Sequence, residues 1–120
     1  MRVIIAGSRH LAGLDVWASI VRGLRELGLM QSVSEVVSGG AQGVDAVGET
    51  YARRFEIPVK RFPANWHKHG RAAGPIRNQE MAEYADALVA IWDGRSRGTA
   101  DMIRQAERFG LKISIQRITE

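Results

Sequence analysis

A short strand pattern, a glycine-rich turn and a helix pattern follow one another directly between residues 35 and 55. The β-branched run ends at Ser38, and the turn that follows reads Ser38-Gly39-Gly40-Ala41-Gln42-Gly43. Apolar residues then recur at helical spacing, at Val44, Val47, Tyr51 and Phe55. Right-handed crossovers return each following strand to the same sheet in the same direction. This unit therefore favours an α/β fold with parallel strands.

The same alternation of patterns continues along the chain. Asp15 can serve as the N-cap of a first helix that stops at Gly28, and Pro75 is expected in the first turn of a later helix. The final helix is expected to begin near Gly98-Thr99, with Phe109 on its apolar face. Further strands are predicted at residues 2–6, 57–61, 87–92 and 111–118, the last an edge strand in which Leu111, Ile113 and Ile115 alternate with polar residues.

These elements predict one domain over residues 1–120, a three-layer α/β/α Rossmann-like open sheet of about five mainly parallel strands. The composition supports folding, because 45% of the residues are hydrophobic and 25% are charged. Ligands of such sheets bind beyond the carboxyl ends of the strands, where the strand order reverses. The turns after Gly7, Gly39 and Asp93, and a long loop over residues 62–74, are expected to converge there.

The glycine-rich turn is the first candidate site. Backbone N–H groups at a helix start are unpaired, the helix dipole is positive there, and glycine allows close approach. We therefore expect Ser38, Gly39, Gly40, Ala41 and Gly43 to hold a phosphate. Asp45, in the first helical turn, can accept from ribose hydroxyls or complement the dipole. The alternative is a tight turn that binds no ligand.

Three further segments carry groups that suit an anion. Gly7-Ser8-Arg9 ends the first strand, and Asp93-Gly94-Arg95-Ser96-Arg97-Gly98-Thr99 precedes the last helix. Arg71, Arg77 and Asn78 lie near Pro75, with Arg77 and Asn78 in the first helical turn, where a cation is unfavourable unless an anion accepts it. The alternatives are solvated arginines, and a plain N-cap at Thr99 after a turn at Gly98.

Other side chains give weaker signals. Trp66 can stack on a base or anchor the long loop to the domain. His67 and His69 lack a third ligand at metal-like spacing, so no metal is assigned. No residues are assigned as catalytic, because the aspartates all have capping or solvent roles available. No cofactor is assigned beyond a nucleotide-derived ligand.

Charge and composition limit the partners. A formal charge of +4 favours anionic partners without separating a nucleotide from a nucleic acid. The chain has no cysteine, which excludes disulfides and thiolate chemistry. No apolar run approaches the roughly 20 residues that span a bilayer. We expect a cytoplasmic protein without a membrane partner, and a homo-oligomer, dimeric or larger, because small parallel domains often pair.

Five ordered motifs together resemble the SLOG superfamily, and in particular its small YspA/YpsA-like branch. They are Gly7-Ser8-Arg9, the segment from Ser38 to Asp45, Ala64-Asn65-Trp66, the segment from Gly70 to Asn78, and the segment from Asp93 to Thr99. DNA-processing protein A of this superfamily carries a similar Gly-Ser-Arg and Ser-Gly-Gly-Ala-x-Gly-x-Asp pair and binds single-stranded DNA. The lonely-guy phosphoribohydrolases cleave nucleoside monophosphates, and other members are thought to sense NAD- or ADP-ribose-like ligands.

The sequence departs from the hydrolase pattern at one informative position. Those enzymes resemble Pro-Gly-Gly-x-Gly-Thr-x-x-Glu, whereas Met102 stands here where the glutamate falls. Methionine cannot stabilise a sugar cation, and Asp101 is rotated by about 100° on a helix. The resemblance therefore favours binding or sensing of a nucleotide or a nucleotide-derived phosphate ligand of the NAD, ADP-ribose or nucleoside monophosphate type. N-glycosidic hydrolysis and single-stranded DNA binding remain the alternatives.

Overall fold

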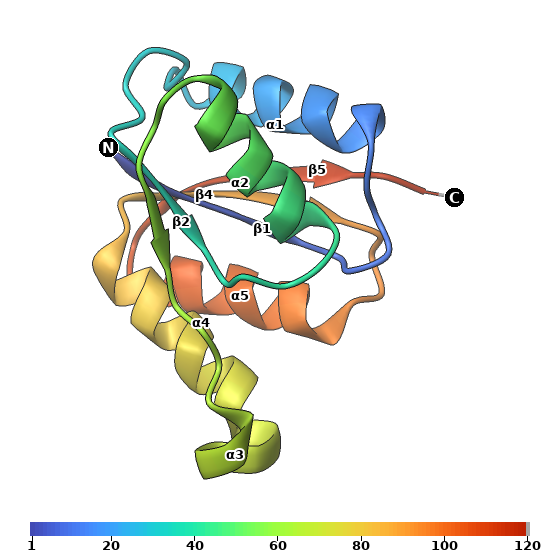
Figure 1. Cartoon of the computed structure of the whole chain (residues 1–120), viewed down its shortest axis with the longest axis vertical. Coiled ribbons are helices and arrows are strands. Elements are labelled where there is room, and N and C mark those ends of the chain that lie inside the picture. Colours follow the sequence, from blue (N-terminus) through green and yellow to red (C-terminus); the bar gives the residue numbers. More distant parts are fainter. Residues whose placement is uncertain (120) are drawn as a thin grey trace.

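Residues 1–119 are described by the computed structural model, which has five strands and four long helices. In chain order the elements are β1 (Arg2–Gly7), α1 (Leu14–Glu26), β2 (Glu35–Ser38), α2 (Val44–Arg54), β3 (Val59–Arg61), α3 (Trp66–His69), η1 (Gly70–Ala72), α4 (Ala73–Tyr84), β4 (Ala87–Trp92), α5 (Arg97–Arg108) and β5 (Lys112–Arg117). All strand pairs are parallel, in the order β3-β2-β1-β4-β5. Helices α1 and α2 cover one face and α4 and α5 the other (Figure 1). The predicted fold is confirmed.

The central strands β1 and β4 are buried on both faces. Val3 and Ile5 of β1 belong to the apolar cluster shared with α1 and α2, whereas Ile4 belongs to the cluster shared with α4 and α5. Each of these three side chains is at most 1% exposed. A strand covered on both faces is an unbroken apolar run. The predicted strands at residues 2–6 and 87–92 therefore match β1 and β4 closely.

The strand order reverses between β1 and β4. From β1 the chain runs through β2 to β3 on one side of the sheet, then crosses back to place β4 on the other side of β1. Gly7, the last residue of β1, lies opposite Ile91 of β4. The loops that leave these two strands diverge, and this leaves a crevice at the carboxyl edge of the sheet.

Three helix positions differ from their predictions. α1 begins at Leu14 after Gly13, whose φ is +79°, so Asp15 lies within the first turn and is not the N-cap. α4 begins at Ala73, because the helical backbone of η1 runs directly into it, and Arg77 and Asn78 fall beyond its first turn. α5 ends at Arg108, so Phe109 takes the C-cap position and is 38% exposed instead of packing in the core.

The edge strand β5 turns its polar side chains inward. Ser114 and Gln116 are buried and both donate to Glu26 of α1, at 2.8 and 2.9 Å. Ile115, which the alternating pattern suggested as core, is 44% exposed. Gly23 explains the close approach of α1, because a Cβ there would collide with Val89 and press on Ser114. The pattern predicted the strand and its edge position but not which face is buried.

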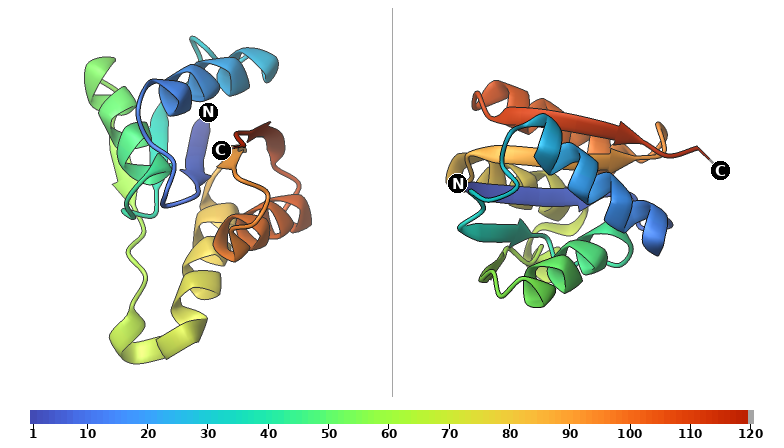
Figure 2. Two further views of the ribbon diagram at one scale, coloured as in Figure 1. Left: turned by 90° about the vertical axis from the view of Figure 1, so that its right-hand side faces the viewer. Right: turned by 90° about the horizontal axis from the view of Figure 1, so that it is seen from above.

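Residues 62–72 form an extension that we call the arm. It contains α3 and η1, so the predicted long loop is partly helical. Asn65 caps α3 by accepting from the Lys68 N–H at 3.0 Å. Figures 1 and 2 show α3 at the far end of α4, well away from the sheet. None of the helices in residues 1–119 has the length and apolar composition of a membrane span.

Candidate functional site

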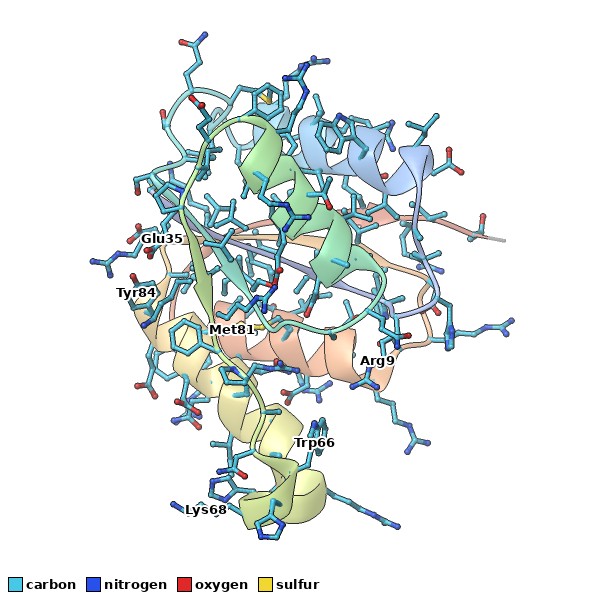
Figure 3. The ribbon with its side chains drawn as sticks, in the orientation of Figure 1. Arg9, Glu35, Trp66, Lys68, Met81 and Tyr84 are labelled. Atoms are coloured by element: carbon cyan, nitrogen blue, oxygen red, sulfur yellow. The ribbon has the colours of Figure 1, made fainter. Side chains whose placement is uncertain are left out.

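A cavity of about 810 Å³ lies beyond the carboxyl ends of β1 and β4. Its base is apolar and includes Ala6, Met81 and Met102, all buried. Its walls come from the loop after β1, the Gly-rich turn, the arm, α4 and the start of α5. Arg9 and Trp66 flank it from two of these segments (Figure 3). The segments expected to converge at this edge therefore do so.

A smaller hollow of about 200 Å³ shares part of this lining. It lies between the Gly-rich turn, represented by Gly39 and Gly40, and Pro63 of the arm. Arg9 and Arg77 line both spaces. The two hollows together offer room for a ligand with more than one chemical part.

Ser8 joins the loops that follow the two central strands. It is 1% exposed, and its Oγ accepts from the Asp93 N–H at 3.2 Å. Its carbonyl accepts from the N–H groups of Leu11 and Val44, at 3.4 and 3.3 Å. A Cβ on Gly7 would collide with the Ile91 carbonyl. Gly7 and Ser8 therefore shape the cavity by holding β1, β4 and α2 together.

The Gly-rich turn is supported from behind by Glu49 of α2. Ser38 is fully buried, and its Oγ donates to the Glu49 carboxylate at 2.7 Å and accepts from the Gly40 N–H at 3.1 Å. Arg61 of β3 completes an ion pair with Glu49. Burial alone would raise the pKa of Glu49, but the hydrogen bonds from Arg61 and Ser38 lower it overall. Ser38 lines neither cavity.

The end of the same turn is partly occupied by protein contacts. The Ala41 N–H donates to Asp45 Oδ2 at 3.1 Å. Gly43 precedes α2 with φ +74°, and a Cβ there would collide with the Arg9 carbonyl. Within residues 1–119 the N–H groups of Gln42 and Gly43 donate to no protein acceptor. Neither Gln42 nor Gly43 lines one of the two hollows, so the turn presents few free donors to the cavity.

Asp45 and Arg77 form the centre of the site. Asp45 is 5% exposed, and burial raises its pKa although the Ala41 N–H and Arg77 oppose the rise. Arg77 of α4 donates to the Gly39 carbonyl at 2.8 Å, and a Cβ on Gly39 would collide with its guanidinium. Burial lowers the pKa of Arg77, Asp45 opposes that, and the nearby positive charge of Arg9 lowers it further. An anion beside Arg9 and Arg77 would relieve their repulsion.

The loop into α5 is closed by Asp93. Its Oδ1 accepts from the N–H groups of Arg95 and Ser96, each at 2.8 Å, and these bonds lower the pKa of Asp93. Ser96 is the N-cap of α5, because its Oγ accepts from the Thr99 N–H at 3.3 Å. Thr99 is therefore not the N-cap. In the described chain the Arg97 and Gly98 N–H groups at the helix start donate to no protein acceptor.

Several arginines around the cavity have no acidic or hydrogen-bonding partner in the described part of the protein. Among residues 1–119 the guanidinium groups of Arg9, Arg95 and Arg97 make no hydrogen bond or ion pair with protein, and all three line the cavity. Asp45 and Asp93 are engaged as described. The cavity therefore presents free cationic donors that suit a phosphate.

Asp101 of α5 is the third carboxylate of the cavity. Its Oδ2 accepts from Asn78 Nδ2 at 2.9 Å, and its Oδ1 lies 3.5 Å from Arg104. Asn78 is itself fixed, because it also donates to the Gly98 carbonyl and accepts from Arg77 Nε. Asp101 and Met102 both line the cavity, so the rotation between them does not remove Asp101 from the site.

Comparison with known proteins now adds to this geometry. The family model described as YspA, cpYpsA-related SLOG family matches residues 1–69, more than half of the chain. The chain belongs to this SLOG family. It is also 34% identical over 121 residues to the Gene 61 protein of Mycobacterium phage D29, with 93% of each chain covered. No solved structure matches it significantly.

The matched segment of the SLOG protein runs from β1 to α3 and includes the Gly-rich turn. The opposite side of the cavity, from α4 and α5, lies outside that segment. Most predicted site residues line one of the two hollows; they are Gly7, Ser8, Arg9, Gly39, Gly40, Ala41, Asp45, Trp66, Arg77, Asn78, Asp93, Ser96, Gly98 and Thr99. Ser38, Gly43 and Arg71 line neither.

Sequence reasoning missed four side chains of the SLOG site. Asp101 was given a capping or solvent role and was set aside because of its rotation from the position of Met102, and Glu49, Met81 and Arg104 were not considered. Glu49 follows Asp45 by four residues and so shares its helix face, which is a usable signal. Trp66 is 52% exposed beside the cavity and does not anchor the arm in the core. No cluster of three or more metal-ligating side chains occurs in the part of the chain that is described.

Proposed function

We propose that this SLOG protein binds a nucleotide or a nucleotide-derived phosphate ligand in the cavity at the carboxyl edge of its sheet. The observation that carries the proposal is the set of uncompensated arginines, Arg9, Arg95 and Arg97, around a cavity with an apolar base. A phosphate needs the former, and the flat face of a nucleobase suits the latter. A family that suggests a nucleotide-related role supports the same assignment.

The phosphate end of the ligand belongs at the start of α5. The Arg97 and Gly98 N–H groups are free there, and the positive end of the helix dipole adds to the arginine charge. The Gly-rich turn offers fewer donors, since the Gly40 and Ala41 N–H groups are already used. The turn then serves a second anionic group or a polar part of the ligand.

Binding fits the site better than cleavage. The base of the cavity carries the apolar Met102 where the related hydrolases have a glutamate. Asp101 is present, but it stands one residue before that glutamate position, and Asn78 fixes its orientation through Oδ2. Hydrolysis of an N-glycosidic bond requires a carboxylate at the position where it can stabilise or trap the sugar cation. We therefore propose a binding or sensing role.

Calorimetric titration with a panel of ligands tests this proposal. The panel contains nucleoside mono- and diphosphates, NAD, ADP-ribose and inorganic phosphate. We expect at least one nucleotide to bind, and Arg97→Gln to weaken it about tenfold or more, because a hydrogen bond to a charged group is worth about 1.5–3 kcal/mol. Arg108→Gln, on the exposed last turn of the same helix, is the matched control and should leave affinity unchanged.

The same samples distinguish the alternatives. Chromatography after incubation with each nucleotide should show no released base, and release would make the site an enzyme. If each ligand binds Arg97→Gln as tightly as it binds the wild type, the proposed position of the phosphate is wrong. Failure of every nucleotide to bind would contradict the proposed function itself.

Single-stranded nucleic acid is a second candidate, favoured by the charge of one segment. Residues 57–79 contain no aspartate or glutamate but five lysines or arginines, namely Lys60, Arg61, Lys68, Arg71 and Arg77. This segment includes the arm, where Trp66 is exposed and can stack on a base. A single-stranded oligonucleotide in the same panel tests it. Affinity that falls steeply with salt would support this candidate.

A further inference from the structure

We propose that Asp101 reads the ribose hydroxyls of the ligand, so that the site selects ribonucleotides over deoxyribonucleotides. The inference rests on the proposed nucleotide-binding function and names the class of ligand that the site prefers. It follows from the different environments of the three carboxylates in the cavity and from the distance between Asp101 and the start of α5.

Two of the three carboxylates are committed to the backbone of their own loops. Asp45 is 5% exposed and accepts from the Ala41 N–H. Asp93 accepts from the N–H groups of Arg95 and Ser96. Both shape the cavity from within the protein. Neither lies on α5, whose start is assigned to the phosphate: Asp45 belongs to α2 and Asp93 to the loop before α5.

Asp101 is held differently. The Asp101 carboxylate is contacted by side chains and not by the backbone of a loop. Asn78 Nδ2 donates to Oδ2 at 2.9 Å, and Arg104 approaches Oδ1 only to 3.5 Å. Its side chain is 18% exposed, whereas that of Arg104 is 67% exposed. A carboxylate oxygen accepts more than one hydrogen bond, so Oδ1 retains capacity toward the cavity. Asp101 is therefore an oriented acceptor with room for a donor from the ligand.

Asn78 makes this orientation rigid. It is 5% exposed, and both its amide protons and its oxygen are used, by Asp101, the Gly98 carbonyl and Arg77 Nε. The same side chain therefore connects the carboxylate to the start of α5 and to the arginine that supports the Gly-rich turn. A fixed acceptor discriminates ligands because a missing donor leaves it unpaired.

The spacing along α5 indicates which part of a nucleotide reaches Asp101. Asp101 follows Gly98 by three residues and Arg97 by four, which is a rise of about 4.5–6 Å along the helix. A phosphate cannot lie against a carboxylate, so it stays at the helix start beside Arg97. In a 5′-nucleotide one sugar ring joins the phosphate to the 2′- and 3′-hydroxyls, and the base extends beyond it. With the phosphate at the start of α5, the 2′- and 3′-hydroxyls of the sugar are therefore the donors that reach Asp101.

Matched pairs of ligands test the inference on the unchanged protein. AMP, 2′-dAMP and 3′-dAMP, and the corresponding guanosine and cytidine pairs, are titrated calorimetrically into the wild type. We expect the ribonucleotide of each pair that binds to do so at least about tenfold more tightly, as hydrogen bonds to charged groups allow. In Asp101→Asn, which keeps the size of the side chain, the preference should fall to less than about threefold.

Two controls separate this role from a structural one. Glu107→Gln removes an exposed carboxylate from the same helix, and the preference should persist. Arg108→Gln removes an exposed charge from the last turn of the same helix, outside the cavity, and the preference should again persist. Circular dichroism of each variant checks its fold, and binding of inorganic phosphate by Asp101→Asn should match the wild type, since the phosphate lies elsewhere.

The outcomes are distinguishable from those of the proposed function. Equal binding of ribo- and deoxyribonucleotides by the wild type overturns the inference and leaves nucleotide binding intact. A ribose preference that survives in Asp101→Asn also overturns it, as does a preference that follows the base and ignores the sugar. If no nucleotide binds the wild type, the proposed function and this inference are both wrong.

Discussion

Hydrogen bonds from Ser38 and Arg61 meet at the carboxylate of Glu49, behind the Gly-rich turn. The Ser38 hydroxyl in turn accepts from the Gly40 N–H. Glu49 is 5% exposed and lines neither hollow, yet its hydrogen bond with Ser38 supports the turn from behind. The residue that presents a glycine turn can therefore lie well outside the motif by which the turn is recognised.

We predict that Glu49→Ala destabilises the protein by about 1–3 kcal/mol, because the buried Ser38 hydroxyl loses its acceptor. The pKa of Glu49 is lower in the folded state than its ordinary value of 4.5. The ionised carboxylate therefore adds to the free energy of unfolding above pH 4.5, and this contribution is lost as the pH falls through the lower folded-state pKa. Urea denaturation at neutral and at acid pH measures this.

The difference between wild type and Glu49→Ala should shrink at the acid end. Glu80→Ala, an exposed glutamate on α4, is the control and should change stability little at either pH. A difference that stays constant from neutral to acid pH would show that the charge of Glu49 is unimportant and that only its packing matters.

For individual residues, the sequence predicted correctly which segments form the site, but it did not predict the contacts that each side chain makes there. Ser8 and Ser38 were predicted to bind phosphate, whereas in the structure both are buried and their hydroxyls bond to protein. Arg77 was identified as an ill-placed helical cation, and its partner is the Gly39 carbonyl. Such partners come from other elements, so spacing along one segment cannot reveal them.

Ser96 controls how α5 begins. Its Oγ accepts from the Thr99 N–H at 3.3 Å and pairs with the Thr99 hydroxyl at 3.0 Å, while Asp93 closes the loop before it. The N-cap Ser96 therefore fixes the backbone at the helix start to which we assign the phosphate. The sequence placed the start of this helix to within a residue or two, but the alternative of a plain N-cap at Thr99 is wrong, because Ser96 is the cap.

We predict that Ser96→Ala destabilises the protein by about 1 kcal/mol, the usual cost of an N-cap, and weakens nucleotide binding as well. Ser96→Asp, another good N-cap, should restore the stability but not the affinity, because it adds negative charge to the cavity. Thermal unfolding and calorimetry report the two effects separately. Ser34→Ala in an exposed loop is the control. Parallel loss and recovery of both quantities would contradict the charge argument.

Among whole elements, the strands buried on both faces were the most predictable. β1 after Arg2 and the whole of β4 are apolar, so no choice of face is involved. β5 has a choice, and it buries Ser114 and Gln116 because Glu26 of α1 accepts from both. Alternation reveals that a strand has two different faces, whereas the neighbouring helix decides which of them is covered.

At the scale of the molecule, the alternation of strands and helices was sufficient to predict the sheet and the edge at which the site lies. The arm was not predictable, because α3 and η1 are too short to leave a periodic pattern and are held by local caps such as Asn65. The arm nevertheless supplies one wall of the cavity through Trp66.

This arrangement predicts where a ligand changes the dynamics of the chain. α3 packs chiefly against η1 and α4, away from the sheet, so its backbone should open with little cost in the free protein. A nucleotide that lies between the start of α5 and Trp66 connects the arm to the sheet. Ligand binding should therefore slow amide exchange in residues 66–77 and in the first turn of α5.

Hydrogen–deuterium exchange with and without the tightest ligand of the panel measures this. At a hundredfold excess over Kd the ligand stabilises the whole fold by about 2.7 kcal/mol, which slows only those amides that exchange through global unfolding. Amides of the arm exchange by local opening, so their slowing reports direct contact. Trp66→Ala should reduce this local protection while α1, on the other face of the sheet, behaves as in the wild type. Protection confined to the sheet, with the arm unchanged, would place the ligand outside this cavity.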